Sequence, residues 1–132
     1  MYSAVDQQWM REAIAQAHQA LYLSNPNPRV GCVIVRDGQI IAKGHTQKVG
    51  GPHAEVQALS DLHSQGLSCE GASIYVTLEP CSHTGRTGPC VDAIIAAKPA
   101  KVFIAMQDPN PLVMGQGIER LKAAGIEVDC GL

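Results

Sequence analysis

The sequence predicts an α/β protein: a three-layer α/β/α sandwich around a five-stranded mixed sheet, in which most strands run parallel and the first two form a hairpin. Three observations support this fold class. Apolar, strand-like runs alternate along the chain with segments of helical periodicity. Several of these runs are apolar on both faces, which suits strands covered by helices on both sides. The 132 residues are enough for one domain, so we expect residues 1–132 to form a single unit.

The first expected element is an amphipathic helix near the N-terminus. Its apolar positions follow the spacing i, i+4, i+7 and i+11. They are Met10, Ile14, Ala17 and Leu21. Asn25-Pro26 ends this helix.

Strands and helices are then expected to alternate. The first two strands, residues 30–35 and 39–44, are joined by Asp37-Gly38, a dipeptide typical of hairpin turns. The remaining strands are expected at residues 72–78, 101–106 and 125–128. The helical segments between them are expected at residues 53–65, 89–97 and 117–124.

Composition and charge exclude several classes of function. Apolar residues make up 45% of the chain and charged residues 17%, as in ordinary soluble domains. The formal net charge of -2 gives no basic surplus for nucleic acid, and no apolar run approaches the roughly 18 residues of a membrane span. The N-terminus lacks the features of a signal peptide, and five cysteines, an odd number, do not suggest a disulfide framework. We therefore expect a cytoplasmic protein without a membrane or nucleic-acid partner.

Two cysteines and one histidine stand at positions typical of a metal site. Cys81 follows the exit of the strand expected at residues 72–78. Cys90 opens the helix expected at residues 89–97, and His53 opens another helix; a proline directly precedes each of them. The three side chains are therefore expected to meet where strands end and two helices begin.

Glu55 lies two residues after His53, in the first turn of the same expected helix. Side chains two positions apart do not share a helix face, so these two can converge only near the helix start. Three protein ligands and one water are typical of catalytic zinc, whereas structural sites close all four positions with protein. Helix N-termini favour thiolates and hydroxide, and zinc lowers the pKa of bound water to about 7. Glu55 is then placed to move protons, and His-x-Glu followed by Pro-Cys is the signature of zinc deaminases.

Each of these assignments has a plainer alternative. The histidine and the two cysteines could be a first-turn residue and two buried thiols, although their combination with Glu55 and two prolines favours the metal site. A structural zinc site would need a fourth ligand, for which His83 is the nearest candidate, and would leave Glu55 without a role. The remaining cysteines have no motif around them and are interpreted as packing or incidental thiols. They are Cys32, Cys69 and Cys130.

Four motifs of this chain closely resemble the deaminase domain of bifunctional riboflavin-biosynthesis proteins, within the cytidine and deoxycytidylate deaminase-like superfamily. They are HAE, PCSHTGRTGPC, NPRVG and DPNPLV, and the likeness runs over nearly the whole chain. In most of the superfamily two residues separate the paired cysteines, whereas eight do so here, as in the riboflavin branch. The resemblance implies the cytidine deaminase-like fold, one zinc ion per chain held by His53, Cys81 and Cys90, and Glu55 as catalytic acid and base.

The resemblance also implies substrate contacts. Asn27 matches an asparagine expected to bond the pyrimidine, and His83 and Arg86 match positions expected near the pyrimidine and the ribose phosphate. Asp108 and Asn110 are expected at the sugar end of the substrate. The plainer alternatives are a turn asparagine, a solvated loop arginine and an Asx-type turn.

One position departs from the family pattern. Many members carry histidine seven residues before the metal-binding histidine, and this chain has Thr46 there, with His45 one position earlier. If the preceding strand keeps its register, these two side chains point to opposite faces. A substrate contact is then either lost or made by the hydroxyl of Thr46.

The resemblance implies deamination of a phosphorylated aminopyrimidine, 2,5-diamino-6-ribosylamino-4(3H)-pyrimidinone 5′-phosphate, with release of its 2-amino group as ammonia. Two alternatives stay open. One is a deaminase of another free nucleobase, nucleoside or nucleotide, of the guanine or cytidine type. The other is a non-catalytic zinc module that partners a separate reductase, because bacterial relatives usually continue into a reductase domain. The candidate partners are therefore a reductase and a second copy of the chain.

Overall fold

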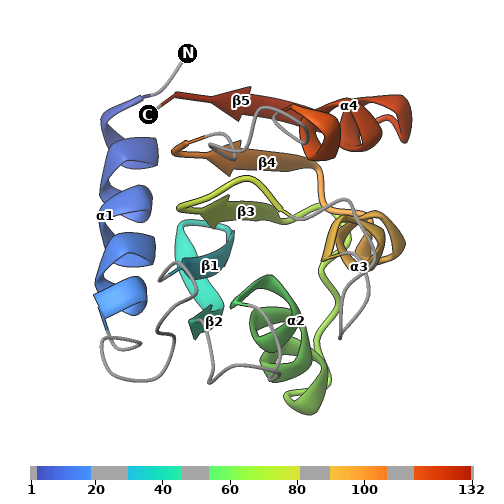
Figure 1. Ribbon diagram of the computed structural model, residues 1–132. Helices are drawn as coiled ribbons and strands as arrows, with labels where there is room; N and C mark the ends of the chain where they lie inside the picture. The colour runs from blue at the N-terminus through green and yellow to red at the C-terminus, as the bar shows by residue number, and fades with distance from the viewer. Residues whose placement is uncertain (1–2, 19–29, 46–53, 81–89, 107–114, 132) are drawn as a thin grey trace.

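The computed structural model describes five stretches of the chain, and within them the elements follow the order α1, β1, β2, α2, β3, α3, β4, α4, β5 (Figure 1). The stretches are residues 3–18, 30–45, 54–80, 90–106 and 115–131. The helices are α1 (Ala4–His18), α2 (Ala54–Ser64), α3 (Cys90–Ala97) and α4 (Gln116–Ala123). The strands are β1 (Gly31–Arg36), β2 (Gln39–His45), β3 (Ser73–Val76), β4 (Lys101–Ile104) and β5 (Glu127–Cys130). All nine lie where the sequence predicts them, with somewhat different ends; Leu21 lies outside the described stretches.

The strands form one mixed sheet in the order β2-β1-β3-β4-β5. β1 is antiparallel to both β2 and β3, whereas β3 with β4 and β4 with β5 are parallel pairs. The mixed sheet and the hairpin are confirmed, and so is the expected majority of parallel strands, because β2, β3, β4 and β5 all run the same way. Of the five described strands, β1 alone runs the other way. The crossover through α2 joins β2 to β3, two strands that run the same way, and β1 lies between them.

The predicted three layers are confirmed: α1 covers one face of the sheet, and α2, α3 and α4 cover the other (Figure 1). The α1 layer buries a small cluster that includes Met10 and Phe103. The opposite layer buries the larger cluster, in which Leu62, Ile94 and Leu121 from the three helices are fully buried. No helix in the described stretches is both long and apolar enough to span a membrane.

The buried face of α1 differs in part from the predicted stripe. Met10 and Ala17 are buried as expected, but the side chain of Ile14 is 42% exposed and Ala13 is buried in its place. The cause is a close approach of the helix to β1. A Cβ atom on Gly31 would lie only 1.8 Å from the carbonyl oxygen of Ala13. Small side chains therefore face the strand, and the bulkier isoleucine is turned away from it.

Asp6 anchors the start of α1 on the sheet. The backbone N–H of Ser3 donates to Oδ2 of Asp6 at 3.0 Å, and the N–H of Asp6 donates to Oγ of Ser3 at 3.1 Å, a reciprocal pair of the capping-box kind. The hydroxyl of Tyr75 in β3 donates to Oδ1 of Asp6 at 2.7 Å. Partial burial raises the pKa of Asp6, but the hydrogen bonds from Ser3 and Tyr75 outweigh it and hold that pKa below its ordinary value of 3.8.

Candidate active site

Three strand exits and one strand entry meet at a single edge of the sheet. The first residue of β1, Gly31, pairs with the last residue of β2, His45. Just beyond β3, the N–H of Thr77 donates to the carbonyl oxygen of Gly31 at 3.1 Å. Two residues later, the N–H of Glu79 donates to the carbonyl oxygen of Met106, beyond β4, at 2.9 Å. Ligands of α/β sheets characteristically bind outside such an edge. We call it the site edge.

Every predicted substrate contact, and two of the three predicted zinc ligands, belong to chain segments whose described neighbours lie at the site edge. Residues 19–29 lead into β1, 46–53 follow β2, 81–89 follow the β3 exit, and 107–114 follow the β4 exit. These segments are outside the described residues, and so are the predicted site residues that they contain. These are Asn27, Thr46, His53, Cys81, His83, Arg86, Asp108 and Asn110. The described residues that flank these segments lie at one edge of the sheet, and the positions of the site residues themselves stay predictions.

Glu55 lies in the first turn of α2, as predicted, and its side chain is only 4% exposed. α2 is packed tightly on β2 at this point. A Cβ atom on Gly44 would lie 2.4 Å from the carbonyl oxygen of Ala54. The N–H of His45 donates to Oε1 of Gln57 at 2.8 Å. The helix turn that carries Glu55 is thereby fixed against the end of β2.

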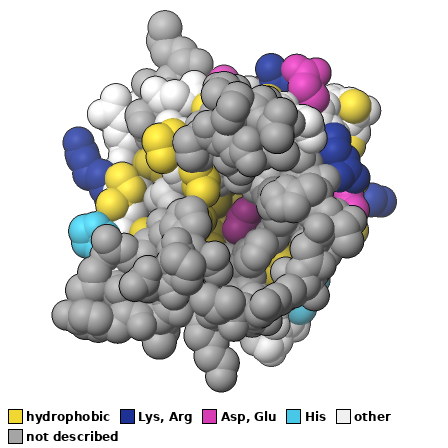
Figure 2. All heavy atoms as spheres, viewed as in Figure 1, with side chains coloured by type: hydrophobic (Ala, Val, Ile, Leu, Met, Phe, Trp, Pro, Cys, Tyr) yellow, Lys and Arg dark blue, Asp and Glu magenta, His cyan; other side chains and the backbone are white. Residues whose placement is uncertain are grey.

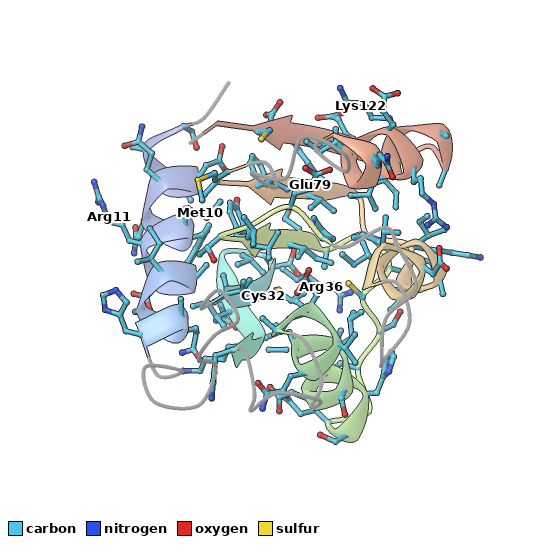
Figure 3. The ribbon with its side chains drawn as sticks, viewed as in Figure 1. Met10, Arg11, Cys32, Arg36, Glu79 and Lys122 are labelled. Atoms are coloured by element: carbon cyan, nitrogen blue, oxygen red, sulfur yellow. The ribbon has the colours of Figure 1, made fainter. Side chains whose placement is uncertain are left out.

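The negative charge of Glu55 affects the pKa of Cys32 in β1. Its thiol is 1% exposed and belongs to the cluster buried under α2 (Figure 3). Burial raises the pKa of Cys32 well above its ordinary value, and the negative charge of Glu55 raises that pKa further. Burial also raises the pKa of Cys69 to about 11. Both thiols are therefore protonated packing residues at neutral pH, as interpreted from the sequence, while Cys130 is exposed.

α3 begins at Cys90, the third predicted zinc ligand, whose side chain lies outside the described residues. The far end of α3 lies at the edge opposite the site edge, because the N–H of Gly71, ahead of β3, donates to the carbonyl oxygen of Lys98 at 3.2 Å. The start of α3 is therefore directed toward the site edge. α3 also packs against α2 on the same face of the sheet. The starts of α2 and α3 are thus both directed toward the site edge.

Glu79 is a buried acid that sequence reasoning missed. Its side chain is 5% exposed and lies between the β3 exit and the start of α4 (Figure 3). Oε1 accepts the N–H of Gly115 at 3.0 Å, and Oε2 accepts the N–H groups of Gly117 at 2.8 Å and Ile118 at 3.3 Å. Two signals could have found it. An acid directly after an apolar strand needs donors if it is buried, and a helix that opens with Gly-Gln-Gly lacks a side-chain cap of its own.

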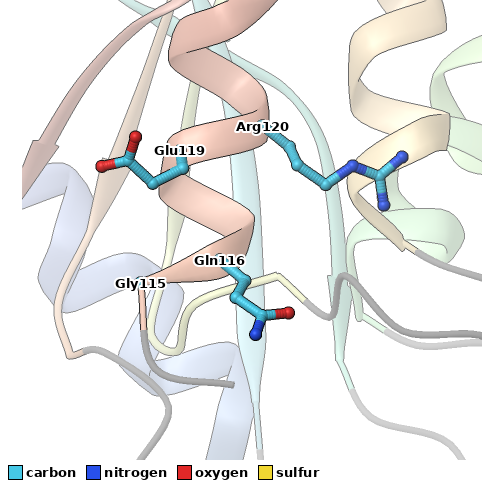
Figure 4. Close-up of a pocket in the computed structure, with 4 residues that line it drawn as sticks. All are labelled: Gly115, Gln116, Glu119 and Arg120. Carbon is cyan, nitrogen blue, oxygen red and sulfur yellow. The ribbon is translucent and has the colours of Figure 1, made fainter. Parts of the chain in front are cut away.

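The start of α4 also borders an open pocket of about 420 Å³ (Figure 4). Its lining residues are Gly115, Gln116, Glu119 and Arg120. The guanidinium of Arg120 forms an ion pair with Asp92 of α3, and this pair ties the two helices together. On the face shown in Figure 2, the basic side chains that are visible lie at the periphery.

Comparison with known proteins places the chain in a family. Residues 3–106 match the model described as "Cytidine and deoxycytidylate deaminase zinc-binding region". The chain is 53% identical over 127 residues to riboflavin biosynthesis protein RibD of Escherichia coli (strain K12), covering 96% of this chain and 34% of that protein. It is 50% identical over 127 residues to the chloroplastic riboflavin biosynthesis protein PYRD of Zea mays, covering 96% and 32%. The chain thus spans about a third of the length of these relatives.

Solved structures give the same result. RibD of Acinetobacter baumannii matches with a TM-score of 0.91 and 54% identity, over 96% of this chain and 35% of that one. A Thermotoga maritima protein, titled diaminohydroxyphosphoribosylaminopyrimidine deaminase/5-amino-6-(5-phosphoribosylamino)uracil reductase, matches with a TM-score of 0.90 and 44% identity, over 96% and 36%. The dCMP deaminase of cyanophage S-TIM5 shares the fold, with a TM-score of 0.77 at 22% identity over 98% of each chain. The predicted cytidine deaminase-like fold is confirmed, and the chain belongs to the family of the cytidine and deoxycytidylate deaminase zinc-binding region.

Proposed function

We propose that this chain is a zinc-dependent hydrolytic deaminase that acts on 2,5-diamino-6-ribosylamino-4(3H)-pyrimidinone 5′-phosphate in riboflavin biosynthesis. The observation that carries the proposal is the 44% identity, over 96% of the chain, to the Thermotoga maritima protein whose title names this deaminase. The RibD and PYRD relatives are about half identical over nearly the same length and support the same pathway.

We assign one zinc ion per chain to His53, Cys81 and Cys90. An imidazole and two thiolates form a donor set that suits zinc and leaves one position for water. Two features of the described residues fit this assignment. The starts of α2 and α3 direct positive helix ends toward the site edge, where thiolates and hydroxide need compensating charge. Glu55 is buried in the first turn of α2, two residues after the first proposed ligand in the chain.

When bound, the zinc ion supplies a water of pKa near 7, and hence a hydroxide nucleophile at neutral pH. Glu55 accepts the proton that this water gives up and delivers it to the ring nitrogen beside the carbon bearing the 2-amino group. Glu55 then takes the remaining proton from the hydroxyl group added to that carbon and gives it to the departing amine, which leaves as ammonia. One water is consumed, and a carbonyl group replaces the amine. Because Glu55 is only 4% exposed, bulk water competes little for these protons.

Substrate contacts are assigned to the four segments that join the chain at the site edge. The positions are Asn27, Thr46, His83, Arg86, Asp108 and Asn110. Arg86 is the residue suited to the phosphate, because a guanidinium forms bidentate, charge-assisted hydrogen bonds with phosphate oxygens. Within the described residues, α2 fixes the end of β2 through Gln57, and so fixes the strand end from which Thr46 follows.

Deamination of guanine or of a cytidine-type substrate is the second candidate. A structure titled guanine deaminase, from Bacillus subtilis, matches with a TM-score of 0.61 and 26% identity over 92% of this chain. Both values are well below those of the riboflavin biosynthesis proteins, which favours the aminopyrimidine. A non-catalytic zinc module is the third candidate. It is disfavoured because it leaves the buried carboxylate of Glu55 without a chemical task.

A reductase is the proposed functional partner, on this chain or another, because the Thermotoga maritima protein is named as both deaminase and reductase. It would consume the deaminated product. We also propose a cytoplasmic location, and a second copy of the chain stays a candidate partner that sedimentation would reveal.

The test is a substrate panel assayed for ammonia release by zinc-loaded protein. The panel contains the riboflavin intermediate, its dephosphorylated form, guanine, cytidine and dCMP. The proposal expects release from the intermediate at a kcat/KM at least about a hundredfold above that for the others. A preference for guanine or cytidine would contradict the substrate but keep the deaminase. Zinc binding without release from any member would favour the non-catalytic module.

A further inference from the structure

The carboxylate of Glu79 is the N-terminal cap of a helix that is distant in the sequence. α4 begins after Gly115, which adopts a left-handed conformation with φ 83° and offers no side chain to accept the first N–H groups of the helix. Glu79 accepts two of these groups, from Gly117 and Ile118, and also the N–H of Gly115 itself, across 36 to 39 residues of sequence separation. Charge-assisted hydrogen bonds of this kind are stronger than neutral ones. They also offset the cost of burying a carboxylate.

The backbone N–H group of Glu79 makes a further contact, with the chain beyond β4. It donates to the carbonyl oxygen of Met106 at 2.9 Å, where the chain leaves β4. Oε1 of the same residue accepts the N–H of Gly115 at 3.0 Å, where the chain enters α4. Glu79 therefore contacts Met106 and Gly115, the two described residues that flank the segment 107–114. That segment carries Asp108, a proposed substrate contact.

Pro80, the residue after Glu79, is also packed closely against α4. Pro80 is fully buried, and a Cβ atom on Gly117 would lie 2.4 Å from its carbonyl oxygen. The first turn of α4 thus rests directly on the Pro80 peptide, and only glycine permits this approach. Cys81, a proposed zinc ligand, is the next residue in the chain. A shift of α4 would therefore act on the peptide that precedes a metal ligand.

From these contacts we infer that Glu79 is a positioning residue of the active site. Its hydrogen bonds hold the β3 exit, which leads to Cys81, against the start of α4. They also hold it against Met106 and Gly115, which flank the segment 107–114. The carboxylate of Glu79 thereby slows the loss of zinc. The inference rests on the proposed function, because it takes Cys81 as a zinc ligand. It goes beyond that function in assigning a role to a residue that neither binds the metal nor touches the substrate.

Glu79→Gln tests the inference with the smallest change of shape. Both carboxylate oxygens accept backbone N–H groups, so an amide must turn an NH₂ group toward at least one of these donors. Zinc-loaded protein is mixed with an excess of a chromogenic chelator, and the rate of zinc release is followed by absorbance. We expect Glu79→Gln to release zinc about tenfold faster than the unchanged protein, at the lower end of the effects seen for residues that support metal ligands.

A matched control separates positioning from general stability. Asp6 is also a carboxylate that caps a helix and bonds to a neighbouring strand, but it lies on the opposite face of the sheet. Asp6→Asn should lower the melting temperature to a degree similar to Glu79→Gln and leave the zinc release rate unchanged. Glu79→Asp keeps the charge on a shorter side chain, so its release rate should fall between those of the unchanged protein and Glu79→Gln. It serves as the main variant should Glu79→Gln fail to fold.

The outcomes are distinguishable. If both Glu79 variants lower the melting temperature as Asp6→Asn does but release zinc at the unchanged rate, Glu79 is only a helix cap and the inference is overturned. If the unchanged protein holds no zinc, or Cys81→Ala retains it, the proposed ligand set fails and the inference falls with it. Faster release in the Glu79 variants alone supports the inference.

Discussion

Replacing Glu55 by glutamine removes one proton carrier while keeping the size of the side chain. General acid–base groups typically contribute 10²- to 10⁴-fold to a rate, and each tenfold is about 1.36 kcal/mol of barrier. Because Glu55 is only 4% exposed, water has little access to replace it, and we expect kcat to fall by at least about 10²-fold, or about 2.7 kcal/mol. The fold should persist. A buried first-turn carboxylate contributes at most about 2 kcal/mol through the helix dipole, which for 132 residues is a change in melting temperature of about 7 °C or less.

The assay measures ammonia release, zinc content and melting temperature on the same preparation of Glu55→Gln. Glu119→Gln is the matched control, since Glu119 lies in the first turn of α4 but is exposed. The control should match the unchanged protein in kcat and differ little in stability. Turnover of Glu55→Gln within a few-fold of the unchanged protein, with zinc in place, would refute the assignment of the proton transfers to Glu55. Loss of zinc in that variant would instead make the residue part of the metal site.

The other predictions concern the metal, the phosphate and the acid stability of the fold. Alanine at any one of the three proposed zinc ligands should reduce zinc from one per chain to nearly none by elemental analysis; a metal-free, fully active variant would exclude that ligand. Arg86→Ala should raise KM about tenfold to a hundredfold for the phosphorylated substrate, because a charged hydrogen bond contributes about 1.5–3 kcal/mol. It should hardly affect the dephosphorylated form, and equal losses on both would assign Arg86 to loop structure. Because the pKa of Asp6 is held below its ordinary value in the folded state, its stabilisation is present above pH of about 4 and is lost as the pH falls through the folded pKa. The difference in melting temperature between the unchanged protein and Asp6→Asn should therefore vanish in acid, and a difference that grew on acidification would contradict this.

Local patterns were sufficient to predict all nine elements, because each helix and strand has its own periodicity and turn residues. The arrangement of the elements depends on contacts between distant residues, and there the sequence was less informative. The antiparallel pairing of β1 with β3 follows from a crossover that passes over β1, which no local signal records. The exposure of Ile14 follows from the close contact between Ala13 and Gly31, residues that belong to different elements.

In the candidate site, too, local signals predicted one buried acid and missed another. The His-x-Glu motif at a helix start predicted where Glu55 lies, because helix-start signals are local, and the structure has it in the first turn of α2. Glu79 escaped notice because its role depends on backbone groups 36 to 39 residues away. In the sequence it is one more acidic residue beside a proline. Only the folded chain brings the uncapped start of α4 to its carboxylate.

Zinc titration of metal-free protein tests the central claim most directly. The protein is stripped with a chelator, zinc is added back in steps, and ammonia release from the phosphorylated aminopyrimidine is measured at each step. A zinc-dependent deaminase with one site per chain predicts no activity without metal, a linear rise, and saturation at one zinc per chain. Full activity in the stripped protein, or no ammonia release with one zinc bound, would contradict the account.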